Sequence, residues 1–126
     1  MERVCFRTRI NPEMRDEYIR RHQAVWPEMT EALAATGWHN YTLFIDDEGT
    51  VFGYFETPDL EVAFAGMAAL DINSRWQAEM APFFPDANGR RPDEGFQLIP
   101  ALVHLTPPAP VRAATGAAQP ERDDLR

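Results

Sequence analysis

The stretch Tyr18-Ile-Arg-Arg-His22-Gln-Ala-Val-Trp26-Pro27-Glu28 determines how the rest of this chain is interpreted. Tyr18 and His22 are four residues apart, so on a helix their side chains lie one above the other. The same stripe of helical spacing continues in both directions through Met14, Val25, Met29 and Leu33. The pattern predicts an amphipathic helix whose imidazole and phenol face the interior, either as satisfied core groups or as the lining of a buried pocket.

The residues on either side of this stretch have the signals of a strand and of helix ends. Residues 3–10 alternate between mostly apolar and mostly polar positions, which predicts a strand. Asn11-Pro12-Glu13 predicts a helix start, because asparagine caps helices and proline suits their first turn. The first helix is expected to run to about Trp26, where Pro27 removes a backbone donor and kinks or restarts it. The second piece then ends just before Gly37, a good terminator.

The next segment predicts a β-hairpin. Residues 38–46 and Val51–Glu56 have strand patterns and are joined by the polar turn Asp46-Asp47-Glu48-Gly49. Tyr41 falls on the side of the first strand that is expected to face the helices. The second strand is apolar on both faces, and helices are expected to cover only one of them. A partner subunit is the expected cover of the other.

Two further helices are predicted in the second half of the chain. Pro58-Asp59 opens a helical region with one apolar side. Asp71 is expected to cap another helix, in which Ile72, Trp76 and Met80 recur at intervals of four. Trp76 therefore lies on the buried side of this last helix.

The end of the chain predicts a loop, a strand and a tail. Residues 82–92 contain proline and glycine and predict a loop. Residues 96–105 predict a final strand, in which Pro100 implies an edge position or a bulge. Residues 106–126 are rich in proline, alanine and charge without apolar periodicity, which predicts a disordered tail. Residues 1–105 are then a single domain.

The order of predicted elements indicates an α+β fold. Strand, helix, strand, strand, helix, strand is the ferredoxin-like βαββαβ arrangement, with an antiparallel sheet covered on one face by helices. The second, apolar face of the sheet predicts that two such sheets pack together as a dimeric α/β barrel.

Composition restricts the class of protein. The chain has 126 residues and a formal net charge of −8, which repels phosphate backbones and argues against nucleic acid as a partner. Its apolar runs are too short for a membrane span, and Met1–Val4 has no signal-peptide pattern. The single cysteine, Cys5, allows no internal disulfide, so we expect a cytoplasmic protein without membrane attachment.

The candidate chemistry is centred on His22. An imidazole beside Tyr18, with Tyr41 facing it from a strand, predicts a pocket that contains a proton-transfer group. Trp76 offers the flat apolar surface on which the C–H face of a sugar packs. The alternative for His22 is a core histidine bonded to a backbone carbonyl, and for Trp76 a plain core residue.

Metal and cofactor sites are not expected. His22, His39 and His104 lie on different predicted elements without metal-ligand spacing. The sequence has no glycine-rich phosphate loop and no nucleophile elbow.

Together these motifs resemble the L-rhamnose mutarotase family. The resemblance extends in collinear order from roughly residue 3 to residue 105, and its most specific part is the opening stretch. Its components are Tyr18-x-x-x-His22, Val25-Trp26-Pro27-Glu28, His39-Asn40-Tyr41 and Arg75-Trp76. Two positions depart from the usual pattern: Gln77 stands where many members have a second tryptophan, and Ala101–Leu105 differs from their final strand.

The resemblance implies a homodimeric α/β-barrel isomerase of the racemase and epimerase class. Such a protein interconverts the α and β anomers of L-rhamnose, or of a related aldose, without a cofactor. By the same resemblance His22 is the acid/base group, and Tyr18, Tyr41 and Trp76 bind the sugar.

Two other functions remain open from the residues alone. Dimeric α/β barrels include cofactor-free monooxygenases of aromatic compounds, and the fold by itself does not distinguish them. A dimer that binds a small molecule without catalysis is the other alternative, with His22 as a structural residue.

Overall fold

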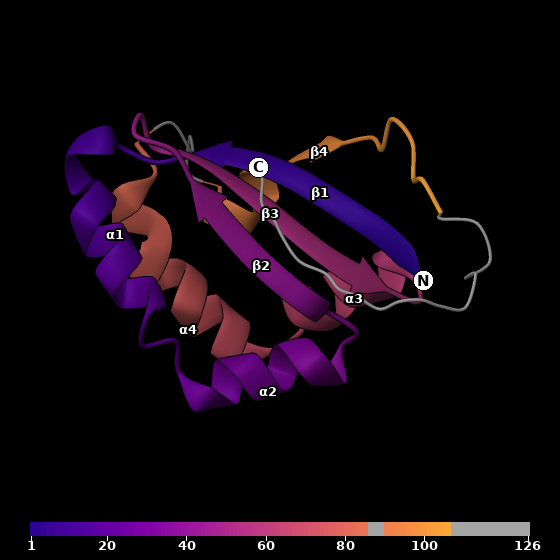
Figure 1. Cartoon of the computed structure of the whole chain (residues 1–126). Coiled ribbons are helices and arrows are strands. Elements are labelled where there is room, and N and C mark those ends of the chain that lie inside the picture. The colour runs from indigo at the N-terminus through magenta and orange to yellow at the C-terminus, as the bar shows by residue number, and fades with distance from the viewer. Residues whose placement is uncertain (86–89, 107–126) are drawn as a thin grey trace, which may run out of the picture.

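The computed structural model describes residues 1–85 and 90–106 and has two layers, a four-stranded sheet and a set of helices packed on one of its faces (Figure 1). In chain order the elements are β1 (Glu2–Arg9), η1 (Pro12–Met14), α1 (Arg15–His22), α2 (Pro27–Ala35), β2 (His39–Ile45), β3 (Thr50–Thr57), α3 (Leu60–Ala68), α4 (Asp71–Met80), η2 (Ala81–Phe83), η3 (Pro92–Gly95) and β4 (Gln97–Ile99). The η elements are short 3₁₀ helices.

The sheet has the order β2-β3-β1-β4, and neighbouring strands are antiparallel. β3 lies between β1 and β2, with which it pairs on either side, and β4 pairs with β1 at the far edge. This is the predicted ferredoxin-like arrangement, and the α+β fold class is confirmed. Pro100 follows an edge strand, as its missing N–H requires.

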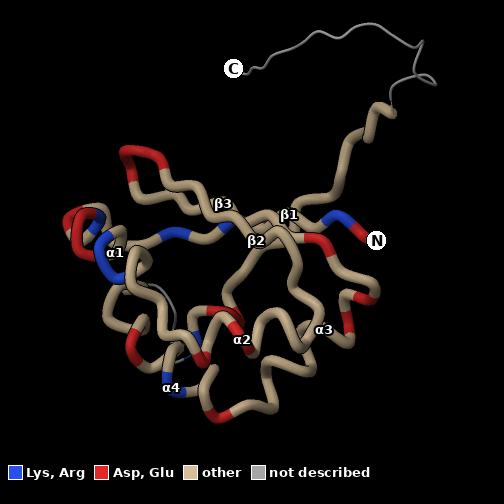
Figure 2. The backbone as a smooth tube through the Cα atoms, turned by 60° about the horizontal axis from the view of Figure 1, so that its bottom comes forward, with Lys and Arg blue, Asp and Glu red and all other residues tan. Residues whose placement is uncertain are grey.

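The two faces of the sheet differ in their cover. Val51 and Phe55 are buried under the helices, at 1% and 0% exposure, and Phe6 of β1 lies with them. The opposite face carries Phe44, which is 58% exposed, and Ile99, which is 37% exposed. In the tube view, acidic residues lie mainly on the helices and turns, whereas β1 carries several arginines (Figure 2).

The first helical region is divided more sharply than predicted. α1 ends at His22, not at Trp26 as predicted, and α2 begins at Pro27. Trp26 is extended, with φ −58° and ψ 133°, because the ring of a following proline disfavours helical backbone at the preceding residue. Gly37 has φ +94° and ends α2 as expected.

The predicted caps have different outcomes. The predicted cap at Asn11 is present: its Oδ1 accepts a hydrogen bond from the Glu13 N–H at 3.0 Å. Asp59, predicted only as part of a helix start, also acts as a cap and accepts a hydrogen bond from the Val62 N–H at 3.2 Å. The predicted cap at Asp71 is wrong: Leu70 precedes the helix, and the Asp71 carboxylate instead pairs with Arg75 at 3.0 Å.

The end of the domain is less regular than predicted. Only Gln97–Ile99 of the predicted strand 96–105 is a strand, paired with Cys5–Arg7 of β1, and Pro100, which has no backbone N–H, follows it directly. In the predicted loop 82–92, η2 and η3 occupy the two ends, and residues 86–89 lie outside the described residues. The predicted tail, residues 106–126, lies outside them from residue 107.

Aromatic packing connects the two layers. Trp38 stacks on Phe55 with ring centroids 4.0 Å apart, and its indole N–H donates to the Ala63 carbonyl at 3.0 Å. This bond fastens α3 to the sheet.

Phe6 lies flat over Gly53 on the helix-covered face and stacks on Phe96, with centroids 3.9 Å apart. A Cβ at position 53 would come within 2.8 Å of three atoms of the Phe6 ring. The glycine therefore makes room for the ring.

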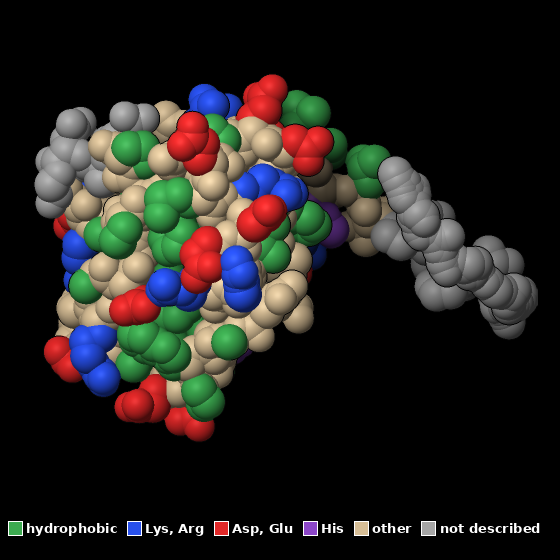
Figure 3. Space-filling model, turned by 90° about the vertical axis from the view of Figure 1, so that its left-hand side faces the viewer, with side chains coloured by type: hydrophobic (Ala, Val, Ile, Leu, Met, Phe, Trp, Pro, Cys, Tyr) green, Lys and Arg blue, Asp and Glu red, His purple; other side chains and the backbone are tan. Residues whose placement is uncertain are grey.

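The α1 end of the molecule carries acidic and basic side chains close together (Figure 3). Arg21 pairs with Glu17 within α1 and with Glu79 of α4, both at 2.7 Å. The exposed pair with Glu79 joins α1 to α4. None of the described helices is long and apolar enough to cross a membrane.

Candidate active site

A cavity of about 1000 Å³ lies between the sheet and the helices. Its lining includes all four residues singled out in the sequence: Tyr18, His22, Tyr41 and Trp76. They come from α1, β2 and α4, so the fold brings together residues far apart in the chain. The volume is at the upper end of the usual range for small-molecule sites.

His22 is the last residue of α1 and has a defined tautomer. Its Nδ1 lies 2.9 Å from the Tyr18 carbonyl oxygen. A carbonyl can only accept, so Nδ1 carries the hydrogen, and in the neutral ring the lone pair is on Nε2. The backbone bond predicted by the core-histidine alternative is therefore present, but in a residue that also lines the cavity.

Two opposing influences act on the His22 charge. Burial lowers the pKa of the imidazole below 6.5, and the hydrogen bond to the Tyr18 carbonyl partly opposes that effect. The position at a helix C-terminus also favours a positive charge. The ring is thus neutral near pH 7 and can take up a proton.

Trp76 packs edge-on against His22, with ring centroids 5.6 Å apart and an interplanar angle of 87°. On another side Trp76 meets Trp26 at 5.1 Å and 86°. Trp76 is 7% exposed. The indole is held in one orientation by two aromatic neighbours and still contributes to the cavity lining.

The two tyrosines are neutral hydrogen-bonding groups. Burial raises the pKa of Tyr18 strongly. It also raises the pKa of Tyr41, with smaller contributions from the nearby Tyr18 and Asp93. Both phenols therefore keep their proton at neutral pH and can donate it in a hydrogen bond.

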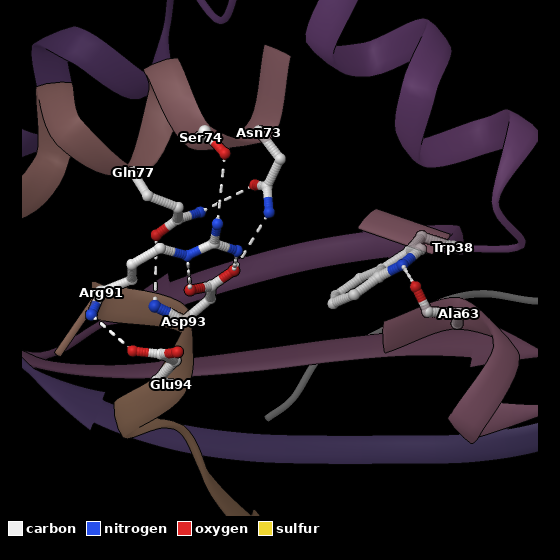
Figure 4. A network of polar contacts seen from close by, with 8 residues as sticks. All are labelled: Trp38, Ala63, Asn73, Ser74, Gln77, Arg91, Asp93 and Glu94. Atoms are coloured by element: carbon white, nitrogen blue, oxygen red, sulfur yellow. Dashed lines mark hydrogen bonds and ion pairs between the residues drawn. The ribbon is translucent and has the colours of Figure 1, made fainter. Parts of the chain in front are cut away.

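A polar wall completes the cavity, and of its residues the sequence interpretation had noted only Gln77, as a departure from the usual family pattern (Figure 4). Asn73 and Gln77 project from α4 and are 2% and 8% exposed. Both hydrogen-bond to Asp93 of η3, and Arg91, just before η3, contacts the carboxylate of Asp93. Asn73 and Gln77 could have been found in the sequence as two amides four residues apart on the helix of Trp76. Arg91 and Asp93 lie in a segment without periodicity, so no sequence pattern marks them.

The other two histidines are not brought into the cavity. His39 on β2 and the exposed His104 do not line it. Within residues 1–85 and 90–106, no three His, Cys, Asp or Glu side chains converge in a way that could hold a metal ion.

The arrangement is suited to proton transfer on a neutral, hydroxylated molecule. A neutral imidazole can accept a proton, two phenols can donate hydrogen bonds, and an indole can cover an apolar face. The polar wall adds further donors and acceptors.

Comparison with known proteins identifies the family. A family model described as L-rhamnose mutarotase matches residues 3–104. An L-rhamnose mutarotase of Burkholderia cenocepacia (strain HI2424) is 39% identical over 106 residues, which are 83% of this chain and 99% of that protein. One of Bacillus subtilis (strain 168) is 42% identical over 74 residues, which are 58% of this chain and 70% of that protein.

A solved structure agrees at the level of the fold. The crystal structure of an L-rhamnose mutarotase from Formosa agariphila superposes with a TM-score of 0.69 at 23% identity, covering 84% of this chain and 100% of that one. The family model, the curated relatives and the fold agree with the resemblance noted in the sequence. This chain belongs to the L-rhamnose mutarotase family.

Proposed function

We propose that this protein interconverts the α and β anomers of L-rhamnose, or of a related aldose, with His22 as the proton-transfer residue. The observation that carries the proposal is the imidazole of fixed tautomer, which lines the same cavity as two neutral phenols and an indole. The reaction belongs to the isomerases, as the family name implies.

The chemistry of mutarotation matches these groups. Ring opening requires a base to remove the proton of the anomeric hydroxyl and an acid to protonate the ring oxygen, and closure on the other face of C1 reverses both transfers. Nε2 of neutral His22 takes the proton of the anomeric hydroxyl and delivers it to the ring oxygen as the bond between C1 and the ring oxygen breaks, and the reverse transfer closes the ring. The hydroxyl of Tyr18 or Tyr41 donates a hydrogen bond to the second oxygen, and Trp76 packs against an apolar face of the sugar.

The rate acceleration that this reaction requires is modest. Mutarotation proceeds slowly without an enzyme, so no strong electrophile is needed. General acid/base catalysis by a positioned side chain supplies about 10²–10⁴-fold, and the cavity adds orientation of the sugar relative to His22.

Exchange between the anomeric NMR signals of L-rhamnose, followed by saturation-difference spectroscopy, tests the proposal. We expect His22→Ala to reduce the protein-dependent exchange rate at least about 100-fold. His39→Ala, a histidine outside the cavity lining, is the matched control and should exchange the anomers like the parent. A His22→Ala protein as fast as the parent would remove His22 from the mechanism.

We also propose that the protein is a cytoplasmic homodimer in which a second copy covers the open face of the sheet. In support, Phe44 and Ile99 are exposed there, whereas a monomer rarely leaves large apolar side chains grouped on a sheet without a partner. Sedimentation velocity of Phe44→Asp should then show a smaller particle than the parent. Val62→Asp, an equally exposed apolar residue on α3, should leave the sedimentation coefficient unchanged, and a monomeric parent would contradict the proposal.

A further inference from the structure

The polar wall has an unusual amount of buried hydrogen bonding for the side of a pocket. Gln77 Nε2 donates to Asn73 Oδ1 at 3.0 Å, and Asn73 Nδ2 donates to Asp93 Oδ2 at 3.1 Å. The Asp93 backbone N–H then donates to Gln77 Oε1 at 3.2 Å. The three residues form a closed ring of hydrogen bonds, which Figure 4 shows between α4 and η3.

Arg91 fixes the Asp93 carboxylate from the other side. Its Nε and Nη2 donate to Asp93 Oδ1 and Oδ2 at 3.2 and 2.9 Å, a two-pronged contact that sets the plane of the carboxylate. Its Nη1 donates to Ser74 Oγ at 3.3 Å, which ties the guanidinium to α4 as well. Asp93 is therefore oriented by side chains from two segments.

Stability alone gives little reason for such a wall. Buried amides and ion pairs roughly offset their own desolvation cost, and apolar side chains of the same shape would stabilise the fold equally well or better. A network in this place is better explained by what it contacts. Asn73, Gln77, Arg91 and Asp93 all line the cavity that contains His22.

The Asp93 carboxylate has capacity left for a ligand. Within residues 1–85 and 90–106 it accepts the three side-chain hydrogen bonds given above, whereas a carboxylate has about four acceptor sites. Its side chain is 20% exposed. A neutral ligand with hydroxyl groups suits this arrangement, since a hydroxyl can donate to the carboxylate and a neighbouring hydroxyl can accept from Arg91 or an amide.

The polar wall also adjoins two of the groups proposed to contact the sugar. Tyr41 is close enough to Asp93 for the carboxylate to influence the phenol electrostatically, and Gln77 directly follows Trp76 on α4. The polar wall is therefore next to Trp76, the indole proposed to cover the sugar. His22, at the end of α1, lies on a different part of the cavity lining.

We propose that Asp93, held by Asn73, Gln77 and Arg91, binds a ring hydroxyl of the sugar other than the anomeric one and thereby determines which aldoses are accepted. Asp93 is a substrate-binding residue in this proposal, and the other three are positioning residues. The inference rests on the proposed mutarotase function, because it assumes that a sugar occupies the cavity.

The experiment compares Asp93→Asn with the parent on L-rhamnose and on its 2-, 3- and 4-deoxy analogues, with anomer exchange measured against sugar concentration. Loss of one hydrogen bond to a charged group changes binding by about 10- to 100-fold. In the parent, one deoxy analogue should therefore have a kcat/KM lower than that of L-rhamnose by about that factor. Asp93→Asn should raise KM for L-rhamnose by about 10-fold with little change in kcat. The same variant should interconvert the anomers of that one deoxy analogue with the kcat/KM of the parent.

The control is Asp71→Asn, the same substitution at the exposed start of α4. It should leave the relative kcat/KM values for L-rhamnose and the deoxy analogues unchanged. If Asp93→Asn does not fold by circular dichroism, Arg91→Lys replaces it, because lysine keeps the charge but loses the two-pronged contact. It should raise KM and weaken the discrimination against the same analogue.

The outcomes separate this inference from the function on which it rests. A parent protein that exchanges no aldose refutes the mutarotase proposal itself. If the parent exchanges all three deoxy analogues as fast as L-rhamnose, or if the variant keeps the parent's discrimination among them, the role of Asp93 is wrong while the mutarotase proposal stands.

Discussion

Replacing Gly53 by alanine should destabilise the protein through a single clash. The new Cβ would come within 2.8 Å of three atoms of the Phe6 ring, and that ring is 1% exposed and stacked on Phe96. Overpacking of a closed core costs about 1–3 kcal/mol. The backbone of Gly53 does not have a positive φ, so alanine recovers about 0.4–1 kcal/mol by restricting the unfolded chain. The net loss should be about 1–2 kcal/mol.

Urea denaturation measures this loss directly. The midpoint for Gly53→Ala should fall by about 0.5–1 M with an unchanged slope. Gly95→Ala is the control, because its added Cβ would meet only Arg90 Nη2, at 3.8 Å, and its stability should stay within about 0.5 kcal/mol of the parent. The same glycine substitution made in a Phe6→Leu background should cost less, because the ring that it displaces is gone. An unchanged midpoint for Gly53→Ala would refute the close packing of Phe6 on the glycine.

Three further predictions concern His22, Trp38 and Asp59. Because burial lowers the pKa of His22 and only the neutral ring accepts a proton, kcat/KM for anomer exchange should rise with pH to a plateau, with its midpoint below 6.5; a midpoint above 6.5 would contradict this role. Trp38→Phe keeps the aromatic stack but loses the hydrogen bond to the Ala63 carbonyl. Urea denaturation should show a free energy of unfolding lower by about 1–3 kcal/mol, and an unchanged value would show that this bond does not stabilise the fold. Asp59→Ala removes a helix cap and should cost about 0.5–2 kcal/mol, whereas Asp71→Ala, which removes no cap, should cost less in the same assay.

The parts of the fold that could be predicted are those with a strong period. Tyr18 and Trp76 are buried because each lies on the apolar side of a helix, and helical spacing reveals that side in the sequence. The alternation in β1 likewise reveals which face the helices cover. His22 and Tyr41 could be assigned to one site because the order of elements fixes the topology.

The parts that could not be predicted depend on contacts between distant segments. The pairing of only Gln97–Ile99 with the distant β1 is not visible in the periodicity of residues 96–105. Asp93 lies in a loop without periodicity, and its place in the cavity depends on Gln77 of α4. Gln77 is visible in the sequence only as a departure from the family's usual tryptophan, while the structure makes it the link between α4 and η3.

The bond between His22 Nδ1 and the Tyr18 carbonyl has a consequence for protein engineering. The oxygen belongs to the main chain, so exchanging the side chain at position 18 leaves the acceptor in place. Position 18 can therefore be varied to reshape the cavity for a different sugar, while the orientation and tautomer of the imidazole are inherited from the helix. The Tyr18 phenol, one of the two candidates for holding the second oxygen, can therefore be removed without removing the hydrogen-bond acceptor of His22 Nδ1.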